Sequence, residues 1–177
     1  MGFWSDWQAA RDRRRRVASY LGHLLGDPDS AQVAWLIGIA EHPHDVPREL
    51  VFVRRAVGLI VAERDALDDR TAADVAHQLA PIIASEARHQ EERGRAWNER
   101  WRAYVAALAV RGSTEPPAAR LGRVLLQGVG TESPTPSQLH GATELVQMHR
   151  NALNEALRAA FGDVTLPEDI APSALRR

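Results

Sequence analysis

The sequence predicts an all-α fold: a single-domain helical bundle of five or six helices. Apolar residues recur at helical spacing in each periodic segment, and residues that start and stop helices separate those segments. No second β-like run exists with which a strand could pair. The 177 residues, 45% of them hydrophobic and 25% charged, suit one globular domain. We expect residues 1–162 to form this domain and residues 163–177 to form a C-terminal tail.

The first helix is predicted to begin at a capping box of Ser5 and Gln8 and to end at Gly26. In the second segment, Asp27 is the expected N-cap and Pro28 the first helical residue. The apolar run that follows, residues 31–40, predicts a buried helix. A third helix should begin near Pro47, and its broad apolar face predicts a central position in the bundle.

A long helical stretch is predicted around residues 72–110. Pro81 lies inside it and is expected to kink or divide it, because proline removes a backbone hydrogen bond and clashes with the preceding turn. A short helix is predicted over residues 118–127. The last helix is expected to open with Thr135 and Pro136 and to close at Gly162.

Arginine dominates the basic residues and clusters near the start of the chain. All 22 basic residues are arginines, although the net charge of the whole protein is only -1. Residues 1–26 carry five arginines against two aspartates, a net charge of +3, whereas residues 27–70 have five arginines against nine acids, a net of -4. On a helix, the run of arginines from 13 to 16 is expected to fan out over most of the circumference.

Tryptophan and arginine are the residue types most enriched at binding hot spots, which favours a binding surface. Trp97 and Trp101 form an aromatic ridge on the long stretch, for which core packing is the alternative explanation. We therefore predict a non-enzymatic interaction or assembly protein that binds a protein partner or its own copies. The predicted surface combines the first helix with the 88–104 stretch, through Trp4, Trp7, Arg11, Arg13, Arg14, Arg15, Arg16, Arg93, Trp97 and Trp101.

Two alternatives remain open. The helix bearing Arg11 to Arg16 suits a nucleic-acid-associated protein, because arginines contact phosphates and nearby tryptophans stack on bases. A metal-binding bundle is the second alternative, since a Glu-x-x-His pattern places a carboxylate and an imidazole on one helix face. Its candidate ligands are Glu86, His89, His140, Glu144 and His149, which could instead be a solvated stretch and a hydrogen-bonded boundary histidine.

Several function classes find no support in the residues. The absence of cysteine excludes a disulfide framework, a thiolate metal site and a cysteine nucleophile. Neither a glycine-rich phosphate loop nor a nucleophile elbow occurs, so we predict no catalytic residue and no cofactor, and a protein that is not an enzyme. No apolar run approaches the ~20 residues of a transmembrane helix, and a cytoplasmic location is expected.

Overall fold

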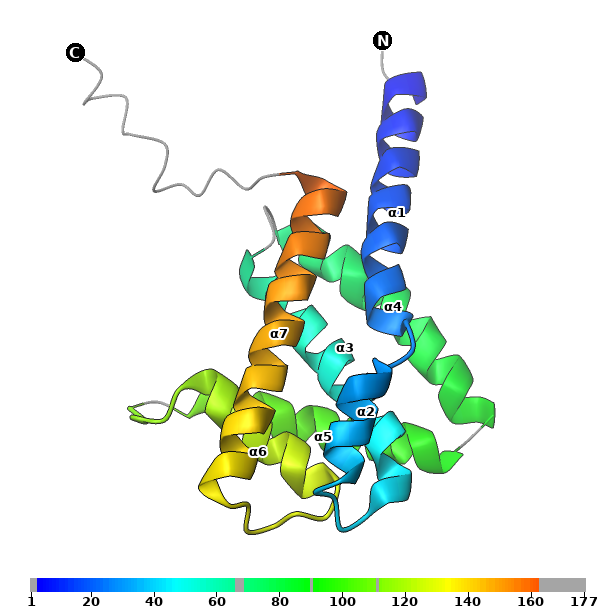
Figure 1. Ribbon diagram of the computed structural model, residues 1–177. Coiled ribbons are helices and arrows are strands. Elements are labelled where there is room, and N and C mark those ends of the chain that lie inside the picture. The colour runs from blue at the N-terminus through cyan, green and yellow to red at the C-terminus, as the bar shows by residue number, and fades with distance from the viewer. Residues whose placement is uncertain (1–2, 66–68, 90, 111, 163–177) are drawn as a thin grey trace, which may run out of the picture.

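The computed structural model describes residues 3–65, 69–89, 91–110 and 112–162, and the side chains of residues 3–6, 69 and 93 are outside that description. Within these ranges the protein is all-α, as predicted, with no strand (Figure 1). The predicted tail, residues 163–177, lies outside the described residues. The elements in chain order are α1 (Phe3–Leu25), α2 (Ser30–Ile37), the short 3-10 helix η1 (Pro43–Asp45), α3 (Val46–Asp65), α4 (Asp69–His89), α5 (Glu91–Ala109), α6 (Pro117–Gly128) and α7 (Pro136–Phe161).

Helix α3 is the centre of the bundle, which confirms the prediction from its broad apolar face. It contacts every other helix. Its side chains Leu50, Phe52, Val53 and Ala56 are almost wholly buried. Helices α6 and α7 pack against each other beside it (Figure 1).

The start of α7 shows why local sequence placed it correctly. The Thr135 hydroxyl accepts a hydrogen bond from the Gln138 backbone N–H at 3.3 Å, and the Gln138 side chain accepts one from the Thr135 backbone N–H at 2.8 Å. This reciprocal capping box satisfies two helix-end donors with residues three apart in the sequence. The helix ends at Phe161, and Gly162 follows with a positive φ of 91°.

The stretch predicted around 72–110 is divided, but not at Pro81, which lies inside α4. Helix α4 ends at His89 and α5 begins at Glu91. A Cβ on Gly94 would lie 2.3 Å from the Ala87 Cβ, whereas seven residues of continuous helix span about 10 Å. The two helices therefore fold back against each other, and glycine permits their close approach.

Helix α2 lies at the edge of the bundle, so the prediction that it is a buried helix is wrong. Leu36 is its one fully buried residue, and Ile37 is 43% exposed. Its N-cap is Asp29 instead of Asp27, because the Asp29 carboxylate accepts from the backbone N–H groups of Ala31 and Gln32. A short apolar run does not reveal whether other helices cover it on one side or on both.

Helix α1 has two different halves. Its second half packs into the bundle through Val17, Tyr20, Leu21 and Leu24, all buried. Its first half extends beyond the bundle (Figure 1), and residues 7–16 are exposed apart from the half-buried Arg13. The sequence therefore gives one helix both an anchored end and a projecting end.

Candidate interaction surface

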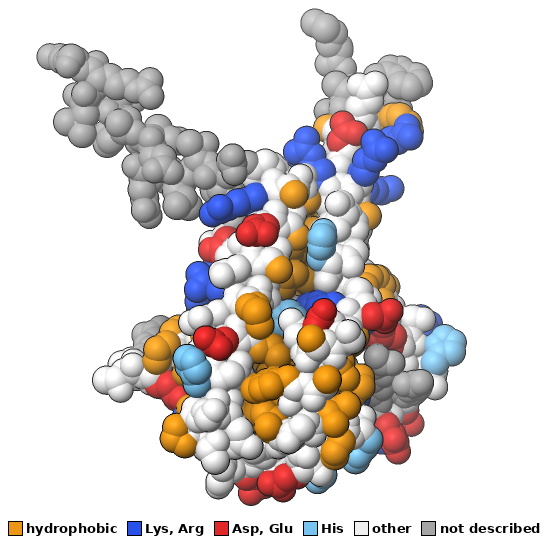
Figure 2. All heavy atoms as spheres, in the orientation of Figure 1, with side chains coloured by type: hydrophobic (Ala, Val, Ile, Leu, Met, Phe, Trp, Pro, Cys, Tyr) orange, Lys and Arg blue, Asp and Glu red, His pale blue; other side chains and the backbone are white. Residues whose placement is uncertain are grey.

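The projecting half of α1 carries a compact basic and aromatic face. At about 100° per residue, Trp7, Arg11, Arg14 and Arg15 fall within about a third of the helix circumference. We call these four residues the Trp7 face. Trp7 is 52% exposed, and the Arg11 guanidinium lies 5.7 Å from the centre of its ring. Basic side chains gather at this end of α1 in the space-filling view (Figure 2).

The remaining arginines of the run point elsewhere. The Arg13 guanidinium lies 3.7 Å from the Asp74 carboxylate, so this residue faces α4. Arg16 is exposed on a side of α1 away from the Trp7 face. The expected fanning-out thus applies to Arg13 and Arg16, but it does not prevent Arg11, Arg14 and Arg15 from sharing one face with Trp7.

In the 88–104 part of the predicted surface, Trp97 belongs to the core and Trp101 packs against it. Trp97 is only 6% exposed and packs edge-on against Phe52 with the ring centres 5.4 Å apart. Trp101 is half-buried and stacks on Trp97 at 6.0 Å. Trp97 is therefore not available to a partner at the surface, and the prediction that it belongs to a binding surface is wrong. The side chains of Trp4 and Arg93 lie outside the description.

Glu86, a candidate metal ligand, is occupied by an arginine of the central helix. The two terminal guanidinium nitrogens of Arg55, Nη1 and Nη2, donate to the Glu86 carboxylate, each at 2.8 Å. Arg55 is buried, and such two-point pairs are the strong form of charged hydrogen bond. The contact explains why a carboxylate continues the apolar stripe of α4: it faces a buried cation.

The other candidate ligands do not converge. The His89 Nδ1 lies 2.7 Å from the Ser85 carbonyl oxygen on the surface of α4. His140 and Glu144 face each other at 3.4 Å on exposed turns of α7, and His149 is buried farther along that helix. Among the described residues no group of three or more such side chains is arranged to hold a metal ion. The metal-binding alternative has no assembled site in this part of the chain.

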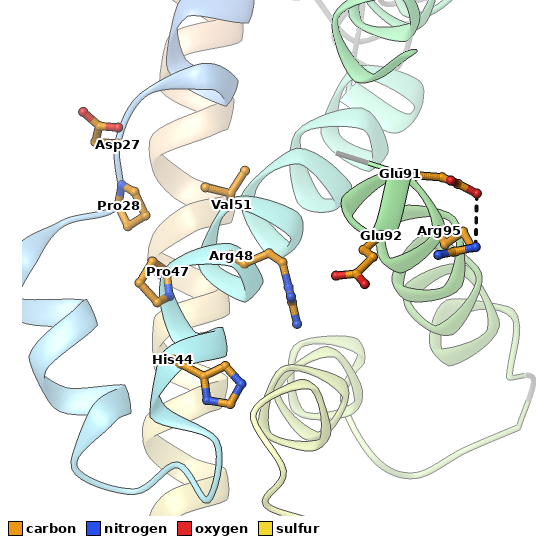
Figure 3. Close-up of a pocket in the computed structure, with 9 residues that line it drawn as sticks. All are labelled: Asp27, Pro28, His44, Pro47, Arg48, Val51, Glu91, Glu92 and Arg95. Carbon is orange, nitrogen blue, oxygen red and sulfur yellow. Dashed lines mark hydrogen bonds and ion pairs between the residues drawn. The ribbon is translucent and has the colours of Figure 1, made fainter. Parts of the chain in front are cut away.

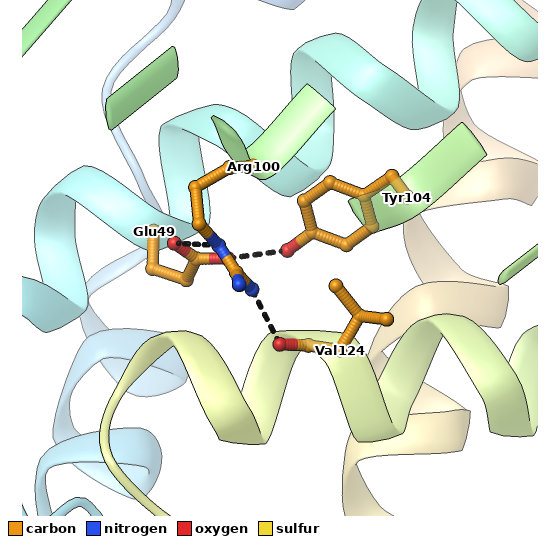
Figure 4. Close-up of polar contacts among 4 residues, drawn as sticks. All are labelled: Glu49, Arg100, Tyr104 and Val124. Carbon is orange, nitrogen blue, oxygen red and sulfur yellow. Dashed lines mark hydrogen bonds and ion pairs between the residues drawn. The ribbon is translucent and has the colours of Figure 1, made fainter. Parts of the chain in front are cut away.

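A buried polar cluster joins α3, α5 and α6, and sequence reasoning missed it (Figure 4). Glu49, 2% exposed, accepts from the Arg100 Nε at 2.8 Å and Nη2 at 2.7 Å, and from the Tyr104 hydroxyl at 2.6 Å. The Arg100 Nη2 also donates to the Val124 carbonyl. Burial raises the pKa of the Glu49 carboxyl, and Arg100 and Tyr104 oppose that rise. Every bond of the cluster is internal, so it holds helices together.

A cleft lies between the start of α3 and the start of α5 (Figure 3). Its volume is about 730 Å³. Arg48 and Glu92 extend into it from opposite walls, and the Arg95 guanidinium lies 3.1 Å from the Glu91 carboxylate. The charges on its walls are thus mixed in sign and partly paired, and the His44 side chain is 78% exposed to solvent. The cleft presents no single-signed surface for a charged ligand.

Comparisons of the chain with protein-family models, with curated proteins and with solved structures find no match. Within the described ranges, none of the helices combines the length and the apolar character needed to cross a membrane.

Proposed function

We propose that the protein is a non-enzymatic helical interaction module that binds an acidic surface of a protein partner through the Trp7 face. One observation carries this proposal: an exposed tryptophan and three exposed arginines share one side of a helix that projects from the bundle. The partner would meet this face without disturbing the packing around α3.

The chemistry of the Trp7 face suits protein recognition. A tryptophan supplies a large apolar contact area, and arginine binds carboxylates through two parallel hydrogen bonds. None of the guanidinium groups of Arg11, Arg14 and Arg15 has a carboxylate partner within the described residues. Their charges are thus available to acidic side chains of a partner.

Nucleic acid is the less favoured ligand for the same face. A nucleic-acid-binding domain typically has a basic pI, whereas this chain has a pI of about 6.7. Arg13 already contacts Asp74, and Asp12 adjoins the Trp7 face. The face therefore offers fewer phosphate contacts than the number of arginines in the sequence run indicates.

A cross-linking experiment tests the proposal. A photo-reactive amino acid at Gln8, beside the Trp7 face, is irradiated in lysate of the source cells with and without nuclease treatment. We expect a nuclease-resistant adduct with one protein, which then binds the purified chain directly. Arg11→Glu/Arg15→Glu should weaken that binding at least tenfold, since each charged hydrogen bond contributes about 1.5–3 kcal/mol.

The matched control is Arg102→Glu/Arg158→Glu, which makes the same charge change at exposed positions of α5 and α7. This variant should bind the partner as the unchanged chain does. An adduct only with a second copy of the chain would replace the proposal with self-assembly. An adduct lost on nuclease treatment, or one unaffected by the α1 substitutions, would overturn it.

A further inference from the structure

A second, smaller cleft lies on the face shown in Figure 2, where the surface is hollowed between α1 and α7. Its volume is about 320 Å³, at the lower end of the range of small-molecule sites. Four helices contribute to it, and its walls are formed by His23, Gln32, Arg54, Met148, His149, Ala152 and Leu153. It is separate from the Trp7 face and shares no lining residue with it.

Arg54 brings a positive charge to this cleft. Its Nη1 donates to the carbonyl oxygens of Gly26 at 2.8 Å and Asp27 at 2.9 Å, which fixes the guanidinium in place. No carboxylate of the described residues forms an ion pair with it. Burial lowers the pKa of Arg54, while Asp27 and Asp29 nearby oppose that effect. This half-buried cation therefore keeps N–H donors that the protein leaves without an anion.

Two further polar groups of the cleft are unsatisfied. His149 is 6% exposed, and its Nε2 has no hydrogen-bond partner. The Gln32 side-chain oxygen is likewise buried and unpartnered. A buried polar group without a partner is costly, and native proteins satisfy the large majority of them. Their presence around one cleft indicates a ligand that completes the hydrogen bonds.

We propose that this cleft binds the carboxylate of a small aliphatic acid. The Arg54 guanidinium supplies the charge, and the His149 Nε2–H and the Gln32 carboxamide donate to the carboxylate oxygens. The Gln32 carboxamide forms no side-chain hydrogen bond elsewhere in the described residues. It can therefore rotate so that its NH2 group, instead of its oxygen, points at the carboxylate. Met148, Ala152 and Leu153 would contact the hydrocarbon part of the acid.

Charge and shape favour a monocarboxylate over phosphate. Burial and the charge of Arg54 lower the pKa of His149 from 6.5 to about 4, so the imidazole is neutral at pH 7. Arg54 is then the cation that faces the acid, and its single charge matches one carboxylate. Its apolar wall would leave the outer oxygens of a phosphate without partners. The His149 Nε2 is shielded from water, so a side chain of the cleft wall has to move when the acid enters. Met148 is suited to this motion because it is unbranched and 53% exposed.

Carboxylate binding would change the titration of His149. A negative charge near the imidazole stabilises its protonated form, so its pKa should rise on binding. The other ionisable groups around the cleft are His23 from α1, Arg54 from α3, and Asp27 and Asp29 before α2. Because these groups stay in place in a ligand titration, the change in the His149 pKa reports the added charge.

The experiment is a titration of the full chain with sodium butyrate at pH 7, followed by calorimetry and by the NMR signal of the His149 imidazole. Acetate, inorganic phosphate and the uncharged butyramide are the comparison probes. We expect saturable butyrate binding, weaker acetate binding, no binding of phosphate or butyramide, and a higher His149 pKa in the presence of butyrate. Equal binding of butyramide, or no binding of butyrate, would overturn the proposal.

Variants locate the site. Arg54→Gln should weaken butyrate binding at least tenfold, because it removes a charged hydrogen bond. Gln32→Ala provides a second variant that is safe for the fold, since the Gln32 side chain holds no helix in place, and it should weaken binding severalfold. Arg48→Gln, which changes the same charge on the mixed-sign cleft, is the matched control and should bind normally. Undiminished binding by both Arg54→Gln and Gln32→Ala would place the acid elsewhere and contradict the proposal.

Discussion

Arginines in the interior of the bundle and arginines on the projecting half of α1 are the same residue type in opposite situations. Arg55 donates two hydrogen bonds of 2.8 Å to Glu86, and Arg100 donates three, of 2.7 to 3.0 Å, to Glu49. Arg11 and Arg15 face solvent and have no carboxylate partner within the described residues. The interior arginines join helices, whereas those of α1 are available to another molecule. The role of an arginine therefore depends on the groups around it in the fold, and not on whether it belongs to a run of arginines in the sequence.

Arg54 is intermediate between these two groups. It is half-buried like an interior arginine, but only backbone carbonyls accept its hydrogen bonds. A cation in that position is neither neutralised by the fold nor exposed to bulk water. This is the physical reason for assigning a ligand to its cleft instead of a role in packing.

The interior pairs should show the largest loss of stability when one member is removed. Arg100→Leu leaves the Glu49 carboxylate buried without its cation, and we expect the free energy of unfolding to fall by about 3–5 kcal/mol. Urea denaturation followed by circular dichroism measures this change.

The double variant Glu49→Leu/Arg100→Leu separates the cost of an unpaired charge from the worth of the pair. It removes both charges, so it should be more stable than Arg100→Leu alone. If the double variant were less stable than Arg100→Leu, the Glu49 side chain would contribute packing or hydrogen bonds, such as the one from Tyr104, that outweigh the cost of its unpaired charge. That outcome would contradict the prediction.

His149, beside the intermediate arginine, should make stability depend on pH. Its pKa is about 4 in the folded protein against 6.5 ordinarily, so between these values the unfolded chain binds more protons. The contribution is complete above about pH 7 and falls as the pH drops through 6.5 toward 4, by about 3 kcal/mol in all. Denaturation at a series of pH values measures it.

Carboxylates also titrate in this range, so the comparison is with His149→Leu. The substituted chain should lose less stability than the unchanged chain between pH 7 and pH 4, because the missing imidazole can no longer take up a proton on unfolding. Parallel stability profiles for the two chains would show that the His149 pKa is not lowered by burial.

Features of the fold that depend on local chemistry could be predicted from the sequence. The all-α class, the central place of the third helix and the cap at Thr135 follow from residue spacing within one helix or from residues three apart. The exposure of α2 and the fold-back between α4 and α5 depend on which helices pack on which. The close approach of Ala87 and Gly94, for example, is a tertiary contact between two helices, and the helical spacing of apolar residues does not predict it.

The candidate sites show the same division. The Trp7 face lies within a short segment of one helix, from Trp7 to Arg15, so its residues could be listed from sequence. An aromatic ridge such as Trp97 and Trp101 has the same spacing in a core as on a surface. Spacing alone therefore could not show that Trp97 is buried. Glu49 and Arg100 are 51 residues apart in the sequence. The signal that could have indicated their pairing is a charged residue within the apolar stripe of α3 and another within that of α5. The cleft at His149 draws on four helices and has no sequence signature.

The anchored half of α1 should tolerate substitution less well than its projecting half. A Cβ on Gly58 of α3 would lie 2.1 Å from the Leu24 Cδ2, and the Tyr20 hydroxyl donates to the Gly58 carbonyl at 2.8 Å. Gly58→Ala should therefore reduce the free energy of unfolding by about 1–3 kcal/mol through overpacking. Leu24→Ala in the Gly58→Ala background should recover part of this loss by making room. No recovery would mean that the strain arises elsewhere.

The smallest effect on stability is expected at the Trp7 face itself. Arg11→Gln/Arg15→Gln removes no buried contact and no carboxylate pair of the described residues, so the free energy of unfolding should change by less than about 0.5 kcal/mol. The same substitutions should weaken the cross-link from Gln8 to the partner, whereas Arg55→Gln should lower stability and leave that cross-link intact in the folded fraction. A loss of stability above about 1 kcal/mol on Arg11→Gln/Arg15→Gln would mean that these arginines belong to the fold, as the interior ones do. The distinction between holding helices together and contacting a partner would then no longer separate the two groups of arginines.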